Sequence, residues 1–227
     1  MSMAPPLINI IVPAYNEGSR IGKVLDVLNN LDKSQFLITV VDDGSTDDTH
    51  KAVSQYPDID YIRHPVNQGK GAAMATGIEN TAGDIILFID ADLIGFKVDQ
   101  VNLLVNPLLS EVTQASMGYL DNIIDGFFGR PLCGNRAYFR SDLLPLLHEM
   151  KTRRYRVEIF LNYHLHDRTY SMNRLNGVTQ PLQTSKYKGI QGYKKYFHIV
   201  WQVLQEMMSY PSPIRAFHWS YLQYFFI

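Results

Sequence analysis

The chain has 227 residues, of which 46% are hydrophobic and 19% charged, and its formal net charge is −1. This composition excludes a disordered or fibrous protein and fits one globular domain with a full core. No apolar run approaches the roughly 18 residues of a membrane span, and residues 1–6 lack the features of a signal peptide. The single cysteine, Cys133, excludes a disulfide framework, so we expect a cytoplasmic protein.

Charge is unevenly distributed along the chain. Residues 1–129 hold 7 basic and 17 acidic side chains, a net charge of −10, whereas residues 130–227 hold 14 basic and 5 acidic ones, a net charge of +9. An acidic first part suits a cation, and a basic second part suits phosphates or an anionic lipid surface. The two parts could also simply attract each other within one fold, and both interpretations can be true.

The first part alternates strand and helix patterns. We expect strands at Leu7–Val12, Phe36–Val41, Ile59–Arg63 and Asp84–Ile89, and helices at Ser19–Leu31, Thr46–Tyr56 and Gly71–Thr81. This order predicts an α/β fold with a Rossmann-like, mostly parallel central sheet and helices on both faces. Sites in such sheets lie outside the carboxyl ends of the strands, so the polar groups that follow the strands are the candidates.

The second part is less regular. A strand is expected at Val112–Met117, and helices at Ser141–Met150, Val157–His166 and Ile190–Met208. The last helix places its apolar residues on one face: Tyr193, Phe197, Val200, Val203, Leu204 and Met207.

The first strand runs into Pro13, which cannot donate to a ladder and should end the strand. Behind it, Tyr15 can pack beside a base or ribose, and Glu17 can accept hydrogen bonds. Taken alone, an ordinary strand-to-helix turn explains this segment better.

Two adjacent carboxylates, Asp42 and Asp43, follow the second strand. They repel each other, and they are tolerable where a ligand donates hydrogen bonds, such as a base N–H or a ribose hydroxyl. Ser45 or Thr46 is expected to cap the next helix.

Lys70 lies between Gly69 and Gly71 at the start of the third helix. This arrangement suggests close approach of the backbone to an anion. The spacing of a P-loop, GxxxxGK[ST], is absent.

Asp90 and Asp92 follow the fourth strand, which is apolar on both faces and therefore central. A divalent cation takes hard oxygen ligands, typically one or two carboxylates together with substrate phosphates. At the end of a central strand we favour metal ligation over a chance Asp-x-Asp.

Four segments together resemble the large inverting glycosyltransferase family 2, typified by bacterial polysaccharide synthases and dolichyl-phosphate sugar synthases. They are IIVPAYNE (10–17), VVDDGSTDDT (40–49), NQGKGAAMATGI (67–78) and GDIILFIDADL (83–93). The resemblance implies the GT-A fold, a UDP- or GDP-sugar donor and a Mg²⁺ or Mn²⁺ ion. The third segment is similar to the branch that glycosylates polyprenyl phosphates.

The resemblance also implies roles for the residues singled out above. Donor binding is implied for Pro13, Tyr15, Glu17, Asp42, Asp43, Lys70 and Asp90. The metal is implied at Asp90 and Asp92, where it acts on the leaving diphosphate as a Lewis acid.

Two later segments resemble the acceptor side of the family less closely. Residues 133–140 are similar to its Gly-x-Arg segment, and Tyr155–Glu158 is similar to a later acidic motif. Arg136 or Arg140 could stabilise the leaving diphosphate, as Lys70 could, or could pair within the fold.

Glu158 is the candidate general base for a hydroxyl acceptor, with Asp121 and Asp125 as rivals. A phosphate monoester has a second pKa of about 6 and needs no base. Glu158 would then pair with Arg154 or Arg156 instead.

Residues 186–227 hold five Lys and Arg, one acidic residue and twelve aromatic residues. This mixture suits a lipid headgroup region, a dimer interface or part of the core. We therefore expect one domain over 1–227, with a donor and metal part (1–93), an acceptor part (94–185) and an amphipathic tail (186–227). The expected partners are a nucleotide-sugar and a lipid-phosphate or glycan acceptor. We also expect a peripheral contact of residues 190–227 with the inner face of the membrane or a homodimer, and no nucleic acid.

Three rival interpretations fit parts of this sequence. A sugar-1-phosphate nucleotidyltransferase would open with a Gly-rich, Arg-containing loop after its first strand. A phospho-receiver signalling domain would carry its acidic pair on the first strand, but here the pair follows the second. A binding-only glycosyltransferase relative is disfavoured by the intact pair of Asp90 and Asp92.

Overall fold

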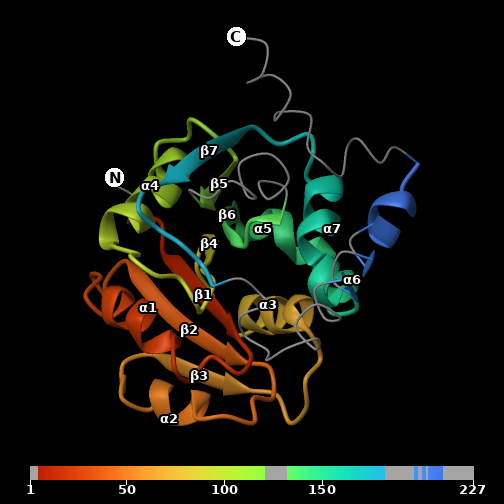
Figure 1. The fold of residues 1–227 in the computed structure, drawn as a ribbon. Coiled ribbons are helices and arrows are strands. Elements are labelled where there is room, and N and C mark those ends of the chain that lie inside the picture. The colour runs from red at the N-terminus through yellow and green to blue at the C-terminus, as the bar shows by residue number, and fades with distance from the viewer. Residues whose placement is uncertain (1–4, 121–131, 182–196, 199–200, 203, 212–227) are drawn as a thin grey trace.

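A seven-stranded sheet organises the computed structural model, which describes residues 5–120, 132–181, 197–198, 201–202 and 204–211 (Figure 1). The strands are β1 (Ile8–Ala14), β2 (Phe36–Asp42), β3 (Asp60–Arg63), β4 (Ile85–Phe88), β5 (Ala115–Leu120), β6 (Asn135–Phe139) and β7 (Tyr170–Leu175). Their spatial order is β3-β2-β1-β4-β6-β5-β7. β6 pairs antiparallel with β4 and β5, and the other pairings are parallel. The expected α/β fold with a mostly parallel sheet is confirmed.

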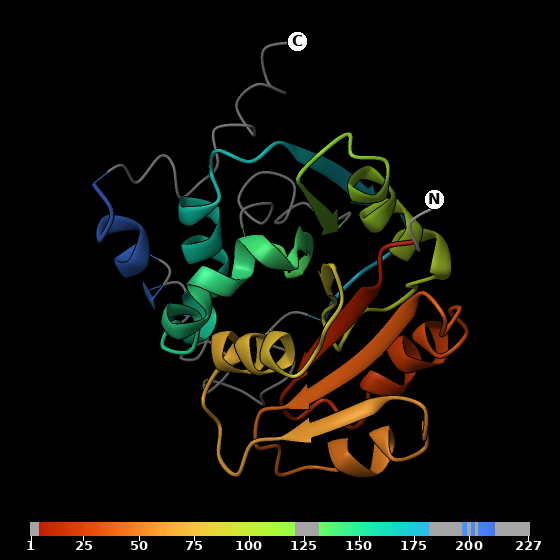
Figure 2. The same ribbon diagram turned by 180° about the vertical axis from the view of Figure 1, so that it is seen from behind.

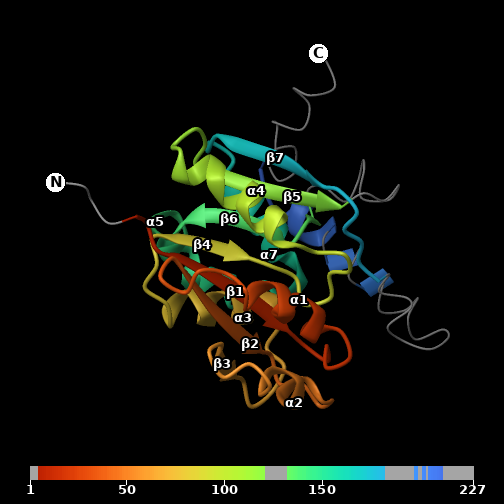
Figure 3. The same cartoon turned by 90° about the vertical axis from the view of Figure 1, so that its left-hand side faces the viewer.

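Helices cover both faces of this sheet. They are α1 (Ile21–Leu28), α2 (Thr49–Val53), α3 (Lys70–Glu79), α4 (Val98–Leu109), α5 (Arg140–Leu143), α6 (Leu147–Met150) and α7 (Val157–His164), with 3₁₀ turns η3 (Leu144–Leu146) and η4 (Arg154–Arg156). Figure 3 shows α1 and α4 in front of the sheet and α3 behind it, and Figure 2 shows the view of Figure 1 from behind. Two buried apolar clusters result, one beneath α1 and α4 and one beneath α3 and α7.

Two of the expected helices differ from those in the structure, one in where it starts and one in being interrupted. The predicted cap at Ser45 or Thr46 is wrong, because α2 begins only at Thr49. There the Asp47 carboxylate accepts the Thr49 N–H at 3.0 Å, so the chain makes a turn before the helix starts. The helix predicted over Ser141–Met150 is broken into α5, η3 and α6, because Pro145 lacks an N–H for a continuous helical ladder.

Three elements, α4, β6 and β7, were not predicted. β6 lies in the segment that was interpreted only as an acceptor-side motif, and it inserts antiparallel between β4 and β5. β5 also begins at Ala115, three residues after the predicted strand start at Val112. The antiparallel direction of β6 determines at which end of the strands Arg136, within β6, and Arg140, just after it, are found.

The described part of the C-terminal segment packs against α7. Met207 is buried against Ile159, and the Tyr210 ring stacks on Tyr163 with centroids 3.9 Å apart. The expected single apolar face is therefore divided, because Met207 points inward while Phe197 is 70% exposed. Tyr193, Val200, Val203 and the last nine residues lie outside the described residues. In the part of the chain that the structure describes, no helix combines the length and apolar character needed to cross a bilayer.

Candidate active site

The candidate site lies at the sheet edge where β1, β2 and β4 end and β6 begins. At its centre, Lys70 at the start of α3 lies between two carboxylates. Its Nζ donates to Asp90 Oδ1 at 2.8 Å and to Glu158 Oε1 at 2.7 Å. Asp90 follows β4, and Glu158 lies in the first turn of α7, so three separate elements meet at one ammonium group.

The two carboxylates keep the Lys70 ammonium in its charged form. Burial alone would lower the pKa of Lys70, but Asp90 and Glu158 raise that pKa well above its ordinary value. The side chains are 20%, 14% and 7% exposed for Lys70, Asp90 and Glu158, so solvent screens them only partly. Glu158 was expected to pair with Arg154 or Arg156 if it was not a base, and that pairing is wrong because its partner is Lys70. The rival bases Asp121 and Asp125 lie outside the described residues.

The turn before β6 presses closely on this cluster. A Cβ atom on Gly134 would overlap both carboxylate oxygens of Asp90 and the Lys70 ammonium, so a larger residue there would push these two side chains out of their present positions. Asn135 Oδ1 accepts the Asp90 N–H at 3.1 Å and fixes the start of the Asp-x-Asp segment. Cys133 is half-buried beside the cluster, and burial raises the pKa of its thiol.

Asp92 is nearly buried, with 3% of its surface exposed. Gln180 Nε2 donates to Asp92 Oδ1 at 2.5 Å. A bridge between Ile94 and Thr179 brings Gln180 to this position. Sequence reasoning missed Gln180, because a contact across 88 positions leaves no local pattern.

The donor set at Asp90 and Asp92 suits a hard divalent cation. Among the described residues no group of three or more His, Cys, Asp or Glu side chains gathers to enclose a metal. Two carboxylates two positions apart instead match the way Mg²⁺ is held, by one or two carboxylates and the oxygens of substrate phosphates. The residues therefore fit a metal that arrives with a diphosphate.

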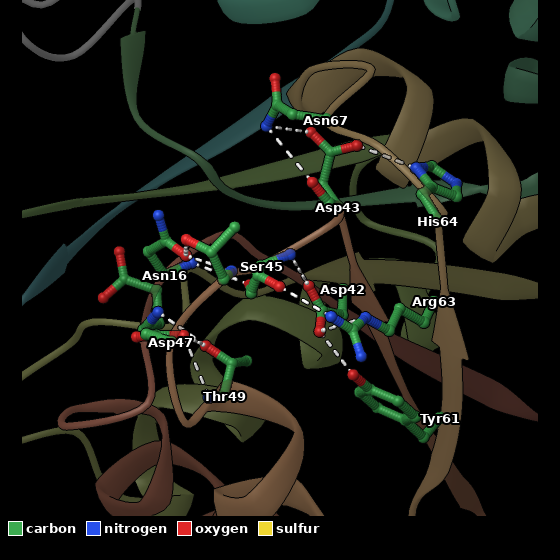
Figure 4. A network of polar contacts seen from close by, with 12 residues as sticks. Asn16, Asp42, Asp43, Ser45, Asp47, Thr49, Tyr61, Arg63, His64 and Asn67 are labelled. Carbon is green, nitrogen blue, oxygen red and sulfur yellow. Dashed lines mark hydrogen bonds and ion pairs between the residues drawn. The ribbon is translucent and has the colours of Figure 1, made fainter.

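Asp42 at the end of β2 is fully buried and accepts hydrogen bonds from its own chain (Figure 4). Ser45 N donates to Oδ1 at 2.7 Å, the Tyr61 hydroxyl donates to Oδ2, and Arg63 Nε lies 3.7 Å from Oδ2. Burial and the contact with Asp42 raise the pKa of Tyr61. The groups that stabilise the buried Asp42 carboxylate are thus protein groups. The sequence had led us to expect that a ligand would supply them.

Asp43 organises the loop that leads to α3 (Figure 4). Its carboxylate lies 2.8 Å from His64 Nδ1, and it accepts from Asn67 Nδ2 at 2.8 Å. It also accepts the backbone N–H groups of Gln68 at 2.8 Å and Gly69 at 2.7 Å. The anion expected beside this glycine-containing loop is therefore supplied, at these two amides, by Asp43 itself. His64 and Asn67 were not singled out from the sequence.

The turn after β1 is held by hydrogen bonds to the loop that follows β2. Pro13 does not end β1, since the strand runs on to Ala14 and Pro13 still lies opposite Val41. Glu17 is buried and accepts from Arg20 Nε at 2.5 Å, while its own N–H donates to Thr49. Tyr15 lies half-buried between these points.

The two arginines of the β6 segment lie at opposite ends of the strand. Arg136 pairs in register with Phe88 at the carboxyl end of β4, whereas Arg140 follows Phe139, which pairs with Ile85 at the start of β4. Four strand residues span about 13 Å, so Arg140 lies away from Lys70. Arg140 Nη2 instead donates to the Ile78 carbonyl at 3.4 Å.

Arg136 is fully buried beneath the site. It donates to the Cys133 carbonyl at 2.5 Å and to Asn162 Oδ1 at 2.7 Å. Arg136 therefore ties the turn before β6 to α7, which carries Glu158, and these contacts favour the pairing interpretation over contact with a diphosphate.

The sequence profile described as Glycosyl transferase family 2 matches residues 9–176, a span that runs from β1 to the end of β7 and includes every residue of the cluster. The chain belongs to this family. The resemblance seen in the sequence motifs is confirmed, and the match replaces the nucleotidyltransferase and receiver-domain interpretations.

Two curated relatives of this family 2 chain have names that state different phosphorylated compounds. A dolichyl-phosphate beta-glucosyltransferase of Trichomonas vaginalis is 36% identical over 123 residues, which are 48% of this chain and 38% of the relative. A glucosyl-3-phosphoglycerate synthase of Mycobacterium tuberculosis is 35% identical over 134 residues, which are 55% of this chain and 39% of the relative. The matched region thus spans less than half the length of either relative.

Solved structures confirm the GT-A fold of this family 2 chain. The M. tuberculosis glucosyl-3-phosphoglycerate synthase in complex with Mn²⁺, UDP and glucosyl-3-phosphoglycerate has a TM-score of 0.73 and 25% identity, covering 90% of this chain and 79% of that one. The same enzyme with Mn²⁺, UDP-glucose and glycerol 3-phosphate gives the same TM-score, identity and coverage.

Proposed function

We propose that the chain transfers a sugar, with inversion, from a nucleoside-diphosphate donor to an acceptor that carries a phosphate. The observation that carries the proposal is the position of Asp90, Lys70 and Asp92 together at the carboxyl edge of the sheet. UDP-glucose in the solved relative supports a UDP-sugar as donor.

The proposed division of the chain follows the sheet. Residues 1–93 supply the donor and metal side, with Pro13, Tyr15 and Glu17 at the nucleotide. Residues 94–185 supply the acceptor side, which includes Glu158. Asp42 and Asp43 act here mainly by holding the two loops in place, because their oxygens already accept protein N–H and O–H groups.

Asp90 and Asp92 are the residues that would hold Mg²⁺ or Mn²⁺. When bound, the ion supplies Lewis-acid stabilisation of the negative charge that develops on the leaving diphosphate. Lys70 adds a fixed positive charge beside Asp90 and holds that carboxylate in position through its 2.8 Å contact.

A phosphate-bearing acceptor is favoured by the state of Glu158. Its Oε1 accepts a hydrogen bond from the Lys70 ammonium at 2.7 Å, so Glu158 already has a role as the partner of Lys70 that does not require it to be a base. A phosphate monoester is already anionic and attacks without a base. The names of both relatives also contain a phosphorylated compound, dolichyl phosphate or a glucosylated 3-phosphoglycerate.

A thermal-shift panel tests the proposed donor. We expect UDP and UDP-glucose with Mn²⁺ to raise the melting temperature, because a ligand at 100 times its Kd stabilises the native state by about 2.7 kcal/mol. GDP and GDP-mannose serve as the alternative nucleotides, and EDTA should remove the effect. A panel in which no nucleotide with Mn²⁺ shifts the transition would overturn the proposal.

A peripheral membrane contact of the C-terminal segment is proposed alongside a lipid-phosphate acceptor. Four exposed apolar residues lie at helical spacing: Phe197, Trp201, Leu204 and Met208. The opposite side, with Glu206 and Met207, is buried against the body of the protein. A dimer interface is the alternative occupant of this apolar face.

Vesicle flotation and light scattering separate these two occupants. We expect the wild type to float with anionic vesicles and the Trp201→Gln/Leu204→Gln variant to lose that binding, because the interfacial apolar area is reduced. Val112→Gln, at another exposed apolar residue, is the matched control. A wild type that does not float but forms a dimer, which the variant converts to a monomer, would favour the dimer interface.

A further inference from the structure

Three arginines lie within four positions on the turn before α7, and two of them have carboxylate partners. Arg153 lies 3.1 Å from Glu149 and 3.5 Å from Glu206, and Arg156 lies 3.3 Å from Glu206. Arg154 differs, since no carboxylate of the described residues lies within 4.0 Å of its guanidinium. Arg154 is exposed and is the cation of this turn that is still available to an outside anion.

Arg154 also holds an unfavourable backbone conformation, with φ at 47°. An L-residue with a long side chain rarely adopts this left-handed region, which glycine and asparagine occupy more easily. Such strain persists where the surrounding structure imposes it, and it concentrates at functional sites. The backbone of this turn would favour glycine or asparagine, so the arginine at position 154 needs another explanation.

The stem of Arg154 leans across the start of α3. A Cβ atom placed on Gly69 would lie 2.5 Å from Arg154 Cγ and 2.9 Å from its Cα, so Gly69 leaves the room that the stem occupies. Gly69 itself has φ at 103° and immediately precedes Lys70. Two residues with positive φ thus pack together beside the Lys70, Asp90 and Glu158 cluster.

We propose that Arg154 is a phosphate-binding residue of this site. The inference rests on the proposed sugar transfer and deepens it by naming a residue that recognises a phosphate. A guanidinium forms two parallel hydrogen bonds with phosphate oxygens, and an exposed arginine without an ionic partner has no competing carboxylate to displace. The phosphate belongs either to the donor's diphosphate or to the acceptor.

Three variants separate charge from structure. Arg154→Asn removes the charge and suits the positive φ, Arg154→Lys keeps the charge without the paired N–H groups, and Lys151→Asn removes a nearby exposed charge that pairs with Glu79 on the surface. Titration calorimetry measures the Kd of UDP with Mn²⁺ and, separately, of 3-phosphoglycerate and of farnesyl phosphate. Melting temperatures without ligand are recorded for every variant.

We expect Arg154→Asn to weaken at least one of these interactions by about 10- to 100-fold, as for the loss of hydrogen bonds to a charged group. Its melting temperature should equal or exceed that of the wild type, since asparagine relieves strain. Arg154→Lys should fall between, and Lys151→Asn should match the wild type. Weakening of UDP alone assigns Arg154 to the donor, and weakening of a phosphate monoester alone assigns it to the acceptor.

A structural role would instead lower the melting temperature of Arg154→Asn and leave every Kd unchanged, and this result would overturn the inference. A wild type that binds neither UDP nor GDP with Mn²⁺ is a different failure, because it would remove the proposed sugar transfer. Unchanged affinity of Arg154→Asn for every probe that the wild type binds overturns the role of Arg154 alone.

Discussion

Replacing Asp92 with asparagine is expected to lower turnover by about a thousandfold or more and to abolish the Mn²⁺-dependent thermal shift by UDP. The substitution keeps the size of the side chain and a carbonyl oxygen that can still accept from Gln180, but it removes one of the two negative charges that would hold the cation. Initial rates with UDP-glucose and the thermal shift with UDP, each with and without Mn²⁺, measure the two effects.

Asp99→Asn is the matched control, because Asp99 is exposed in the first turn of α4 and loses the same charge. It should keep both the rate and the shift. The unliganded melting temperature of Asp92→Asn must stay near that of the wild type, so that lost binding is not lost folding. If Asp92→Asn kept the full Mn²⁺-dependent shift, the metal assignment would be wrong.

Replacing Lys70 with methionine is expected to cost about 3 kcal/mol of unfolding free energy and to weaken UDP binding. The methionine fills a similar volume but leaves Asp90 and Glu158 without their shared cation in a poorly solvated position. Urea denaturation measures the free energy of unfolding, and calorimetry measures the Kd of UDP with Mn²⁺.

A double-mutant cycle shows whether like charges cause this loss. Adding Glu158→Gln to Lys70→Met should restore part of the stability, since one carboxylate is then neutral, whereas Glu158→Gln alone breaks a good ion pair. Additive effects would contradict the cluster. Glu158→Gln also reports on the acceptor: a 10²- to 10⁴-fold loss of turnover with intact UDP binding would indicate a general base and a hydroxyl acceptor.

The sequence predicted most elements of residues 1–93 well because its signals there are local. β1, β2 and α3 carry apolar runs and periods that are complete within a dozen residues, and the polar residues that follow the strands meet at one edge for reasons of topology alone. Lys70, Asp90 and Asp92 could therefore be named before their positions were known.

The second half depends on contacts between distant segments. Asn135 reaches Asp90 across 45 positions and Gln180 reaches Asp92 across 88, and neither contact leaves a periodic pattern. The direction of β6 decides that Arg136 lies near the site and Arg140 does not. That direction follows from the pairing of β6 with both neighbours, which short strands do not reveal by themselves.

Asp43 has a consequence for how a nucleotide would meet this surface. Its carboxylate gathers His64, Asn67 and two backbone N–H groups, so the loop before α3 takes its shape when the chain folds, without waiting for a ligand. A donor that binds beside this loop would then meet a preorganised surface, so binding would not cost the conformational entropy of ordering the loop. The loop before α3 would therefore bind a donor without changing shape, and any conformational change on binding would occur in other parts of the chain.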